Sequence, residues 1–75
     1  TLKVVNTIGH KPKKNTRLVE KRGERSQKDV AEGIGISYAY YSMIESGKRI
    51  PPYNVMKKIA NYYGVKPDYF FYHAV

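Results

Sequence analysis

The sequence predicts an all-α fold built from five short helices. Glycines and prolines divide residues 14–75 into short segments, whose apolar residues recur at helical spacing and do not alternate as in strands. With 75 residues and no cysteine, the chain is a single small domain, so its core must come from helix packing. We expect a basic N-terminal arm over residues 1–13, flexible or extended, followed by the helical domain over residues 14–75.

The first two helices are marked by their ends. The first is predicted over about residues 14–23, with Leu18 and Val19 as its apolar contacts and Gly23 at its end. The second is predicted over residues 27–34, because Ser26 is a favourable N-cap residue before an apolar periodic segment.

A third helix is predicted over residues 38–46, after a tight turn. Gly35 can adopt the left-handed conformation that reverses the chain, and Ser37 is a suitable N-cap. Ala31 is small enough to lie where the two helices cross. The apolar residues expected between these helices are Val30, Ile34, Ile36, Tyr41 and Ile44. Residues 27–46 therefore have the pattern of a helix-turn-helix, whose second helix enters the DNA major groove.

The last third of the chain predicts two more helices. Residues 48–52 form a basic loop, because a residue that precedes proline is driven out of helical conformation. A fourth helix is expected over residues 52–63 and a fifth over residues 68–72. The buried stripe of the fourth is expected to contain Val55, Met56, Ile59 and Ala60. The aromatic residues expected to close the core are Tyr62, Tyr63, Tyr69, Phe70, Phe71 and Tyr72.

The charge of the chain favours a polyanionic partner. The formal net charge is +8, of which +6 falls on residues 1–25. Two histidines near opposite ends, His10 and His73, argue against a metal site or a catalytic triad, and no phosphate-binding loop is present. We expect no enzyme activity, cofactor or metal. Without a long apolar run, we also expect no membrane segment and a cytoplasmic location.

Three stretches carry a family resemblance: SQKDVAEGIGIS (26–37), YYSMIESGKRIP (40–51) and KKIANYYGVKPDYFF (57–71). Through them, residues 17–71 resemble the Cro and repressor family of helix-turn-helix proteins, also called the xenobiotic-response-element family. The resemblance implies a five-helix, lambda-repressor-like DNA-binding domain that regulates transcription in a bacterial or phage-like setting, at the nucleoid.

The resemblance also implies roles for particular residues. The positions that match the family's base contacts are Ser37, Tyr38, Ala39, Ser42 and Met43. Those that match its phosphate contacts are Ser26, Gln27, Lys28, Ser46, Lys48 and Arg49. In the family, the residue that matches Glu45 pairs with an arginine of the first helix, here Arg17 or Arg22.

The sequence departs from the family pattern at two points. Tyr41 occupies a position that is usually Ile or Val, so a buried hydroxyl needs a partner there. The third helix also lacks the Gln, Asn or Arg that pairs with a purine through two hydrogen bonds. Tyr38, Ala39 and Met43 are instead expected to contact thymine methyl groups.

These observations predict a sequence-specific regulator of transcription, a repressor that binds an inverted repeat in double-stranded DNA as a homodimer. The basic arm is expected either to contact the minor groove or to be a disordered tail. Two alternatives remain open. One is a protein-interaction module, such as an antitoxin, that uses the tyrosine-rich third helix. The other is a non-specific binder of nucleic acid or anionic membranes through the arm. No small-molecule ligand is evident from the sequence.

Overall fold

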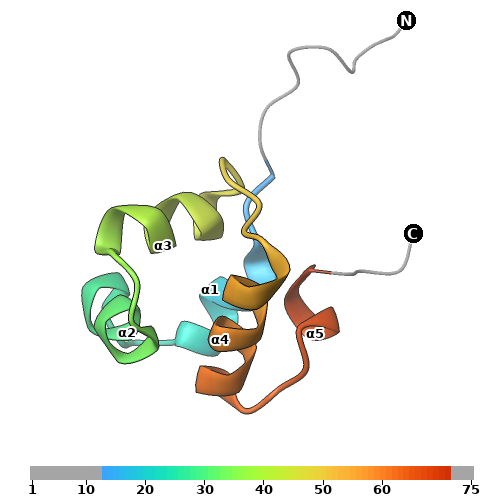
Figure 1. The fold of residues 1–75 in the computed structure, drawn as a ribbon. Helices are drawn as coiled ribbons and strands as arrows, with labels where there is room; N and C mark the ends of the chain where they lie inside the picture. Colours follow the sequence, from blue (N-terminus) through green and yellow to red (C-terminus); the bar gives the residue numbers. More distant parts are fainter. Residues whose placement is uncertain (1–12, 72–75) are drawn as a thin grey trace, which may run out of the picture.

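Five helices make up the part of the chain that the structure, a computed structural model, describes, which is residues 13–71 (Figure 1). They are α1 (Thr16–Arg22), α2 (Gln27–Ile34), α3 (Tyr38–Ser46), α4 (Tyr53–Tyr63) and α5 (Asp68–Phe71). No strand occurs within this range, so the predicted all-α fold is confirmed. The predicted arm, apart from Lys13, lies outside the described residues, as does Tyr72.

The helix boundaries follow their capping residues. The predicted bounds of α2 and α3 are confirmed, and Ser26 and Ser37 each accept a hydrogen bond from the third residue beyond them. The predicted start of α1 was two residues too early. Asn15 is extended there, and its side chain accepts a hydrogen bond from the backbone of Leu18 at 3.1 Å, which makes it the N-cap. Pro52 likewise precedes α4 as its N-cap.

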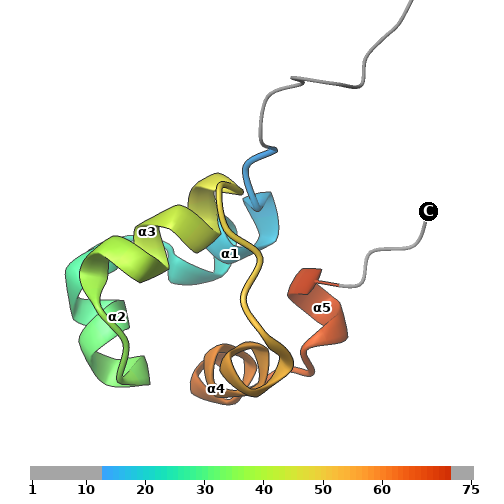
Figure 2. The same cartoon turned by 45° about the horizontal axis from the view of Figure 1, so that its top comes forward.

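The helices pack around two groups of buried side chains. One group consists of Leu18, Ile44, Ile59 and Phe70, and the other of Val30, Ala31 and Tyr41. Because α3 contributes a residue to each group, its inner side is fixed against both. In Figure 2, where α4 is seen nearly along its axis, α2 and α5 lie on opposite sides of α4.

Several expected core residues are less buried than the sequence predicts. Ile34 and Ile36 are partly buried at the boundary between the two groups. Tyr69 was expected in the core but is 38% exposed, because its ring packs at the surface beneath the Arg17 guanidinium, 5.0 Å from the ring centre. Phe70, the next residue along α5, is fully buried instead.

The turn between α2 and α3 has the predicted geometry. Gly35 adopts a φ of 96°, and the backbone amides of Gly35 and Ile36 both donate to the carbonyl of Ala31. Ala31 is 1% exposed and belongs to the same buried group as Tyr41 of α3. The turn therefore holds α3 at a fixed angle to α2.

The chain that enters α1 crosses the C-terminal end of α3. The amide of Asn15 donates to the carbonyl of Glu45 at 2.8 Å, and its side-chain nitrogen donates to the carbonyl of Phe70 at 3.1 Å. Gly47, with a φ of 85°, lies so close to this segment that a β-carbon there would overlap the Lys13 carbonyl. Segment 13–15 thus joins the end of α3 to α5.

We expect Gly47→Ala to destabilise the domain more than Gly35→Ala. Both substitutions place a side chain in left-handed backbone, at a cost of about 1–2 kcal/mol. Only Gly47→Ala also displaces the backbone of Lys13, which adds roughly 1–3 kcal/mol, because nothing lies within 4 Å of a β-carbon at Gly35. Urea denaturation of both variants measures the difference. Equal losses would mean that Lys13 does not pack on Gly47.

Candidate nucleic-acid interface

The outer side of α3 presents the residues expected to contact bases. Tyr38 is 55% exposed, Ala39 is exposed, and Ser42 and Met43 are partly exposed. The spacings of three and four residues between them place all four on one continuous stripe of α3. The predicted base-contact residues are thus accessible together.

Ser37 begins the same surface. Its hydroxyl oxygen accepts a hydrogen bond from the amide of Tyr40 at 3.1 Å, and this bond fixes the start of α3. The hydroxyl hydrogen can still be donated to a ligand, since a serine hydroxyl is both donor and acceptor. Tyr40 itself packs partly buried against the core, so it belongs to the scaffold.

The predicted phosphate-contact residues form two groups, one at the start of α2 and one at the end of α3 and in the loop after it. At the start of α2, Lys28 is exposed, and the Ser26 hydroxyl caps the helix by accepting from the amide of Asp29 at 3.0 Å. Gln27 is partly buried, and its side-chain nitrogen donates to Glu45 at 2.8 Å. An amide nitrogen has a second hydrogen to donate. The Gln27 side chain is thus held in place by the core, a role that sequence reasoning missed.

The other phosphate-contact residues follow α3. Lys48 and Arg49 are exposed, and both backbone amides donate to the carbonyl of Met43, which folds the loop back onto the helix. The Ser46 hydroxyl donates to the same carbonyl at 3.1 Å. This carbonyl therefore fixes the loop that carries both cations.

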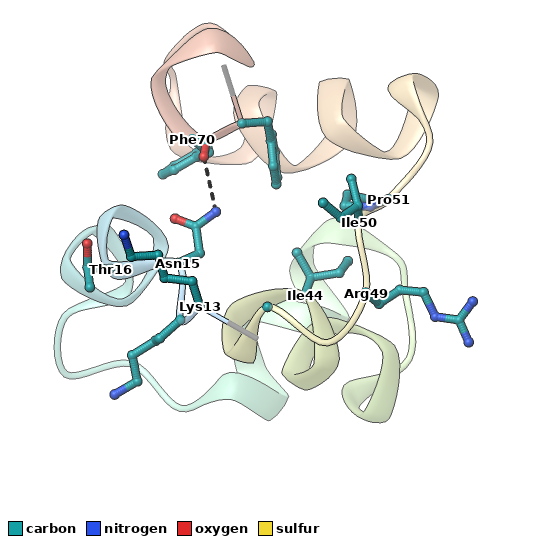
Figure 3. Close-up of a pocket in the computed structure, with 11 residues that line it drawn as sticks. Lys13, Asn15, Thr16, Ile44, Arg49, Ile50, Pro51 and Phe70 are labelled. Carbon is teal, nitrogen blue, oxygen red and sulfur yellow. Dashed lines mark hydrogen bonds between the residues drawn. The ribbon is translucent and has the colours of Figure 1, made fainter. Parts of the chain in front are cut away.

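Two lysines that sequence reasoning did not assign to the site lie beside this loop. Lys13 and Lys14 are exposed and border the same cavity as Arg49 and Gly47 (Figure 3). They are brought there by the bond between the Asn15 amide and α3. No local sequence signal could show this, because the contact joins residues thirty positions apart.

Glu45 lies beneath the interface as a buried carboxylate, 3% exposed. Of the two candidate arginines, Arg22 is its partner. Nε and Nη2 of Arg22 donate to the two carboxylate oxygens at 2.7 and 3.1 Å. Burial by itself raises the pKa of Glu45, but hydrogen bonds from Arg22, Gln27 and Tyr41 outweigh it and hold the pKa below its ordinary value.

Tyr41 has the hydroxyl partner that its position requires. The side chain is fully buried, and its hydroxyl lies 2.8 Å from the hydroxyl of Tyr63. Burial, followed by the hydrogen bonds to Tyr63 and Glu45, raises the pKa of Tyr41, so the phenol stays neutral. The residue that departs from the family pattern therefore links α3 to α4.

Two other kinds of site are absent from residues 13–71. No helix in this range is long and apolar enough to cross a membrane. Nor does the range contain three acidic, histidine or cysteine side chains grouped as metal ligands.

Comparison with known proteins gives one match. A family model described as Helix-turn-helix matches residues 18–70, which is most of the chain. No curated protein and no solved structure matches it.

We expect Glu45→Gln to lower the free energy of unfolding by about 2–4 kcal/mol, because it leaves the Arg22 guanidinium without its charge partner in a largely buried setting. Glu20→Gln is the matched control. It removes the same charge from an exposed site on α1 and should change stability by no more than about 0.5 kcal/mol. Urea denaturation at pH 7 measures both. Similar effects would contradict a special role for Glu45.

The Glu45 contribution should also depend on pH. Folding lowers the pKa of Glu45, so the stabilisation is fully present above the unfolded value of about 4.3 and is lost as the pH falls through the folded pKa. The difference in stability between the wild type and Glu45→Gln should therefore shrink below about pH 4. If the difference in stability stayed constant from pH 7 to pH 3, the stabilisation by Glu45 would not come from the charge of its carboxylate.

Proposed function

The chain belongs to the helix-turn-helix family of the Cro and repressor type, and from this premise we propose that it is a sequence-specific regulator of transcription that binds double-stranded DNA. The observation that carries the proposal is the outer side of α3. It combines accessible side chains for base contact with cations at its end. An α-helix with its side chains is about 10–12 Å in diameter, so α3 fits a major groove about 12 Å wide.

In this proposal, phosphate contacts supply most of the affinity. Lys28 and Gln27 contact the backbone at the start of α2, together with Ser26, and the loop after α3 contacts it through Ser46, Lys48 and Arg49. Neutralised phosphates release counterions, so binding weakens steeply with salt. The positive charge around the end of α3, including Lys13, supports this assignment.

Base discrimination is proposed to come from apolar contacts. Tyr38, Ala39 and Met43 offer methyl and ring surfaces that suit the methyl group of thymine, and Ser37 and Ser42 offer hydroxyls that can donate or accept. α3 carries no Gln, Asn or Arg, so purine recognition through paired hydrogen bonds is not available to it. We therefore expect A·T-rich half-sites.

The proposed regulator acts as a homodimer on an inverted repeat and represses by occupying its operator. A two-fold axis between two such domains places their recognition helices about 34 Å apart, in successive major grooves. A contact between the basic arm and the minor groove stays a prediction, because residues 1–12 lie outside the described part of the chain. The proposed setting is the nucleoid of a bacterium or of a phage-infected cell.

A protein-interaction module is the second candidate. The observation that favours it is the large exposed ring of Tyr38, because tyrosine is enriched in protein interfaces. In an antitoxin-like protein, α3 would contact a partner protein instead of bases. The two candidates differ in whether duplex DNA binds at low salt.

We expect binding to random duplex DNA at low salt, with a dissociation constant that rises steeply between about 50 and 200 mM salt. Arg49→Ala should weaken binding to all sequences alike and reduce the slope of log K against log salt by about one. Lys66→Ala removes the same charge from the segment before α5 and is the control, with little change in slope. Absence of binding in a gel shift at low salt would favour the protein-interaction candidate.

Selection from randomised duplexes should enrich an inverted repeat. On that operator, Met43→Ala should change the preference at one base pair by about 1–3 kcal/mol, because the thioether contacts a single thymine methyl. Competition with point-substituted duplexes measures the preference. Equal weakening at every base pair would contradict a reading role for Met43, and a direct repeat or single half-site would contradict the two-fold dimer.

A further inference from the structure

A cavity of about 630 Å³ lies between the segment that enters α1, the loop after α3 and α5 (Figure 3). This volume is within the range of about 300–1,000 Å³ that is typical of sites for small organic ligands. The cavity lies at the end of α3 and does not include the outer side of that helix, where Tyr38 and Ala39 lie. It is therefore separate from the proposed base-contact surface.

Five of the eleven residues that line the cavity are apolar. Its apolar lining residues are Ile44, Ile50, Pro51, Phe70 and Phe71. The base of the cavity is formed by buried residues, namely Ile44, Pro51 and Phe70. At the rim, Phe71 is partly exposed and Ile50 is 77% exposed. A flat apolar ligand that packs against Ile50 and the ring of Phe71 removes apolar surface from water, which favours binding.

The rim of the cavity is positively charged. Lys13, Lys14 and Arg49 border it, and its eleven lining residues include no acid. In Figure 3, Lys13 and Arg49 extend from opposite sides of the opening, with their charged ends in solvent. Both side chains are flexible, and rotation toward the opening brings either charge closer to an anionic group of a ligand whose apolar body fills the cavity.

We propose that this cavity binds a small organic anion, an aromatic carboxylate of one or two rings. The rings lie against Ile50 and Phe71, and the carboxylate lies between Lys14 and Arg49. The charge of the rim decides for an anion over a neutral or cationic ligand.

Because of the position of the cavity, its ligand is expected to regulate DNA binding, and this part of the proposal rests on the proposed function. Arg49 borders the cavity and is also a proposed phosphate contact. A carboxylate held by Arg49 competes with a DNA phosphate for the same guanidinium, so the ligand should weaken DNA binding in proportion to its occupancy of the cavity.

The test is a titration of the ¹⁵N-labelled full chain at low salt with 2-naphthoate and, as a neutral analogue with the same rings, 2-naphthylmethanol. We expect 2-naphthoate to shift the backbone amides of Gly47, Ile50 and Phe71, with a dissociation constant on the order of 1 mM or below. The alcohol should bind roughly fivefold more weakly, because it lacks the charge.

Variants assign the two parts of the site. Lys14→Gln should weaken naphthoate about twofold and leave the alcohol unchanged. Lys58→Gln removes the same charge from α4, outside the cavity, and should change neither ligand. Ile50→Ser alters an exposed side chain, so the fold should persist while both ligands bind more weakly.

Several results would overturn the proposal. Equal binding of acid and alcohol would remove its anion specificity. Unshifted cavity amides at millimolar naphthoate would mean that the cavity is closed or filled by another part of this chain. Shifts of the same amides on dilution without ligand would assign the cavity to a second copy. Each readout is independent of DNA. Naphthoate binding without DNA binding would therefore reject only the proposed function. DNA binding without naphthoate binding would reject only the proposed ligand site.

Discussion

The structure depends on one buried carboxylate. Glu45 lies on α3 with almost no access to water. A buried ion is tolerated only if protein groups replace the hydrogen bonds that it makes with water in the unfolded chain. The replacements come from Arg22 on α1, Gln27 on α2 and Tyr41 on α3 itself. The Tyr41 hydroxyl is in turn hydrogen-bonded to that of Tyr63 on α4. The donors on α1 and α2 reach the carboxylate only when their helices lie at one position relative to α3. The carboxylate therefore fixes the placement of α3, and its donors keep it ionised.

This arrangement separates the scaffold of α3 from its outer side. Apolar packing through Ile44 and the polar contacts of Glu45 both act on the inner side. Residues on the outer side, such as Ala39 and Met43, have no structural task of comparable weight. A change of sequence preference can therefore proceed by substitution on the outer side while the helix keeps its position, which suits a fold that serves many DNA sequences.

The sequence predicted what is determined locally. α2, the turn and α3 were placed correctly because Ser26, Gly35 and Ser37 act within a few residues of themselves. It could not determine what distant contacts decide. The choice of Arg22 over Arg17, the surface position of Tyr69 and the second role of Gln27 all follow from helices meeting in space. The lysines beside the site and the cavity likewise depend on a distant contact, the bond between the Asn15 amide and the Glu45 carbonyl at the end of α3.

That contact has a consequence for the order in which the domain folds. The α2–α3 unit closes through short loops and can pair as soon as residue 46 has been synthesised. Asn15, by contrast, finds its side-chain acceptor only in Phe70, 55 residues further along the chain. During synthesis, the α2–α3 unit can therefore form early, whereas the hydrogen bond that fastens the start of α1 to α5 waits until residue 70 has left the ribosome.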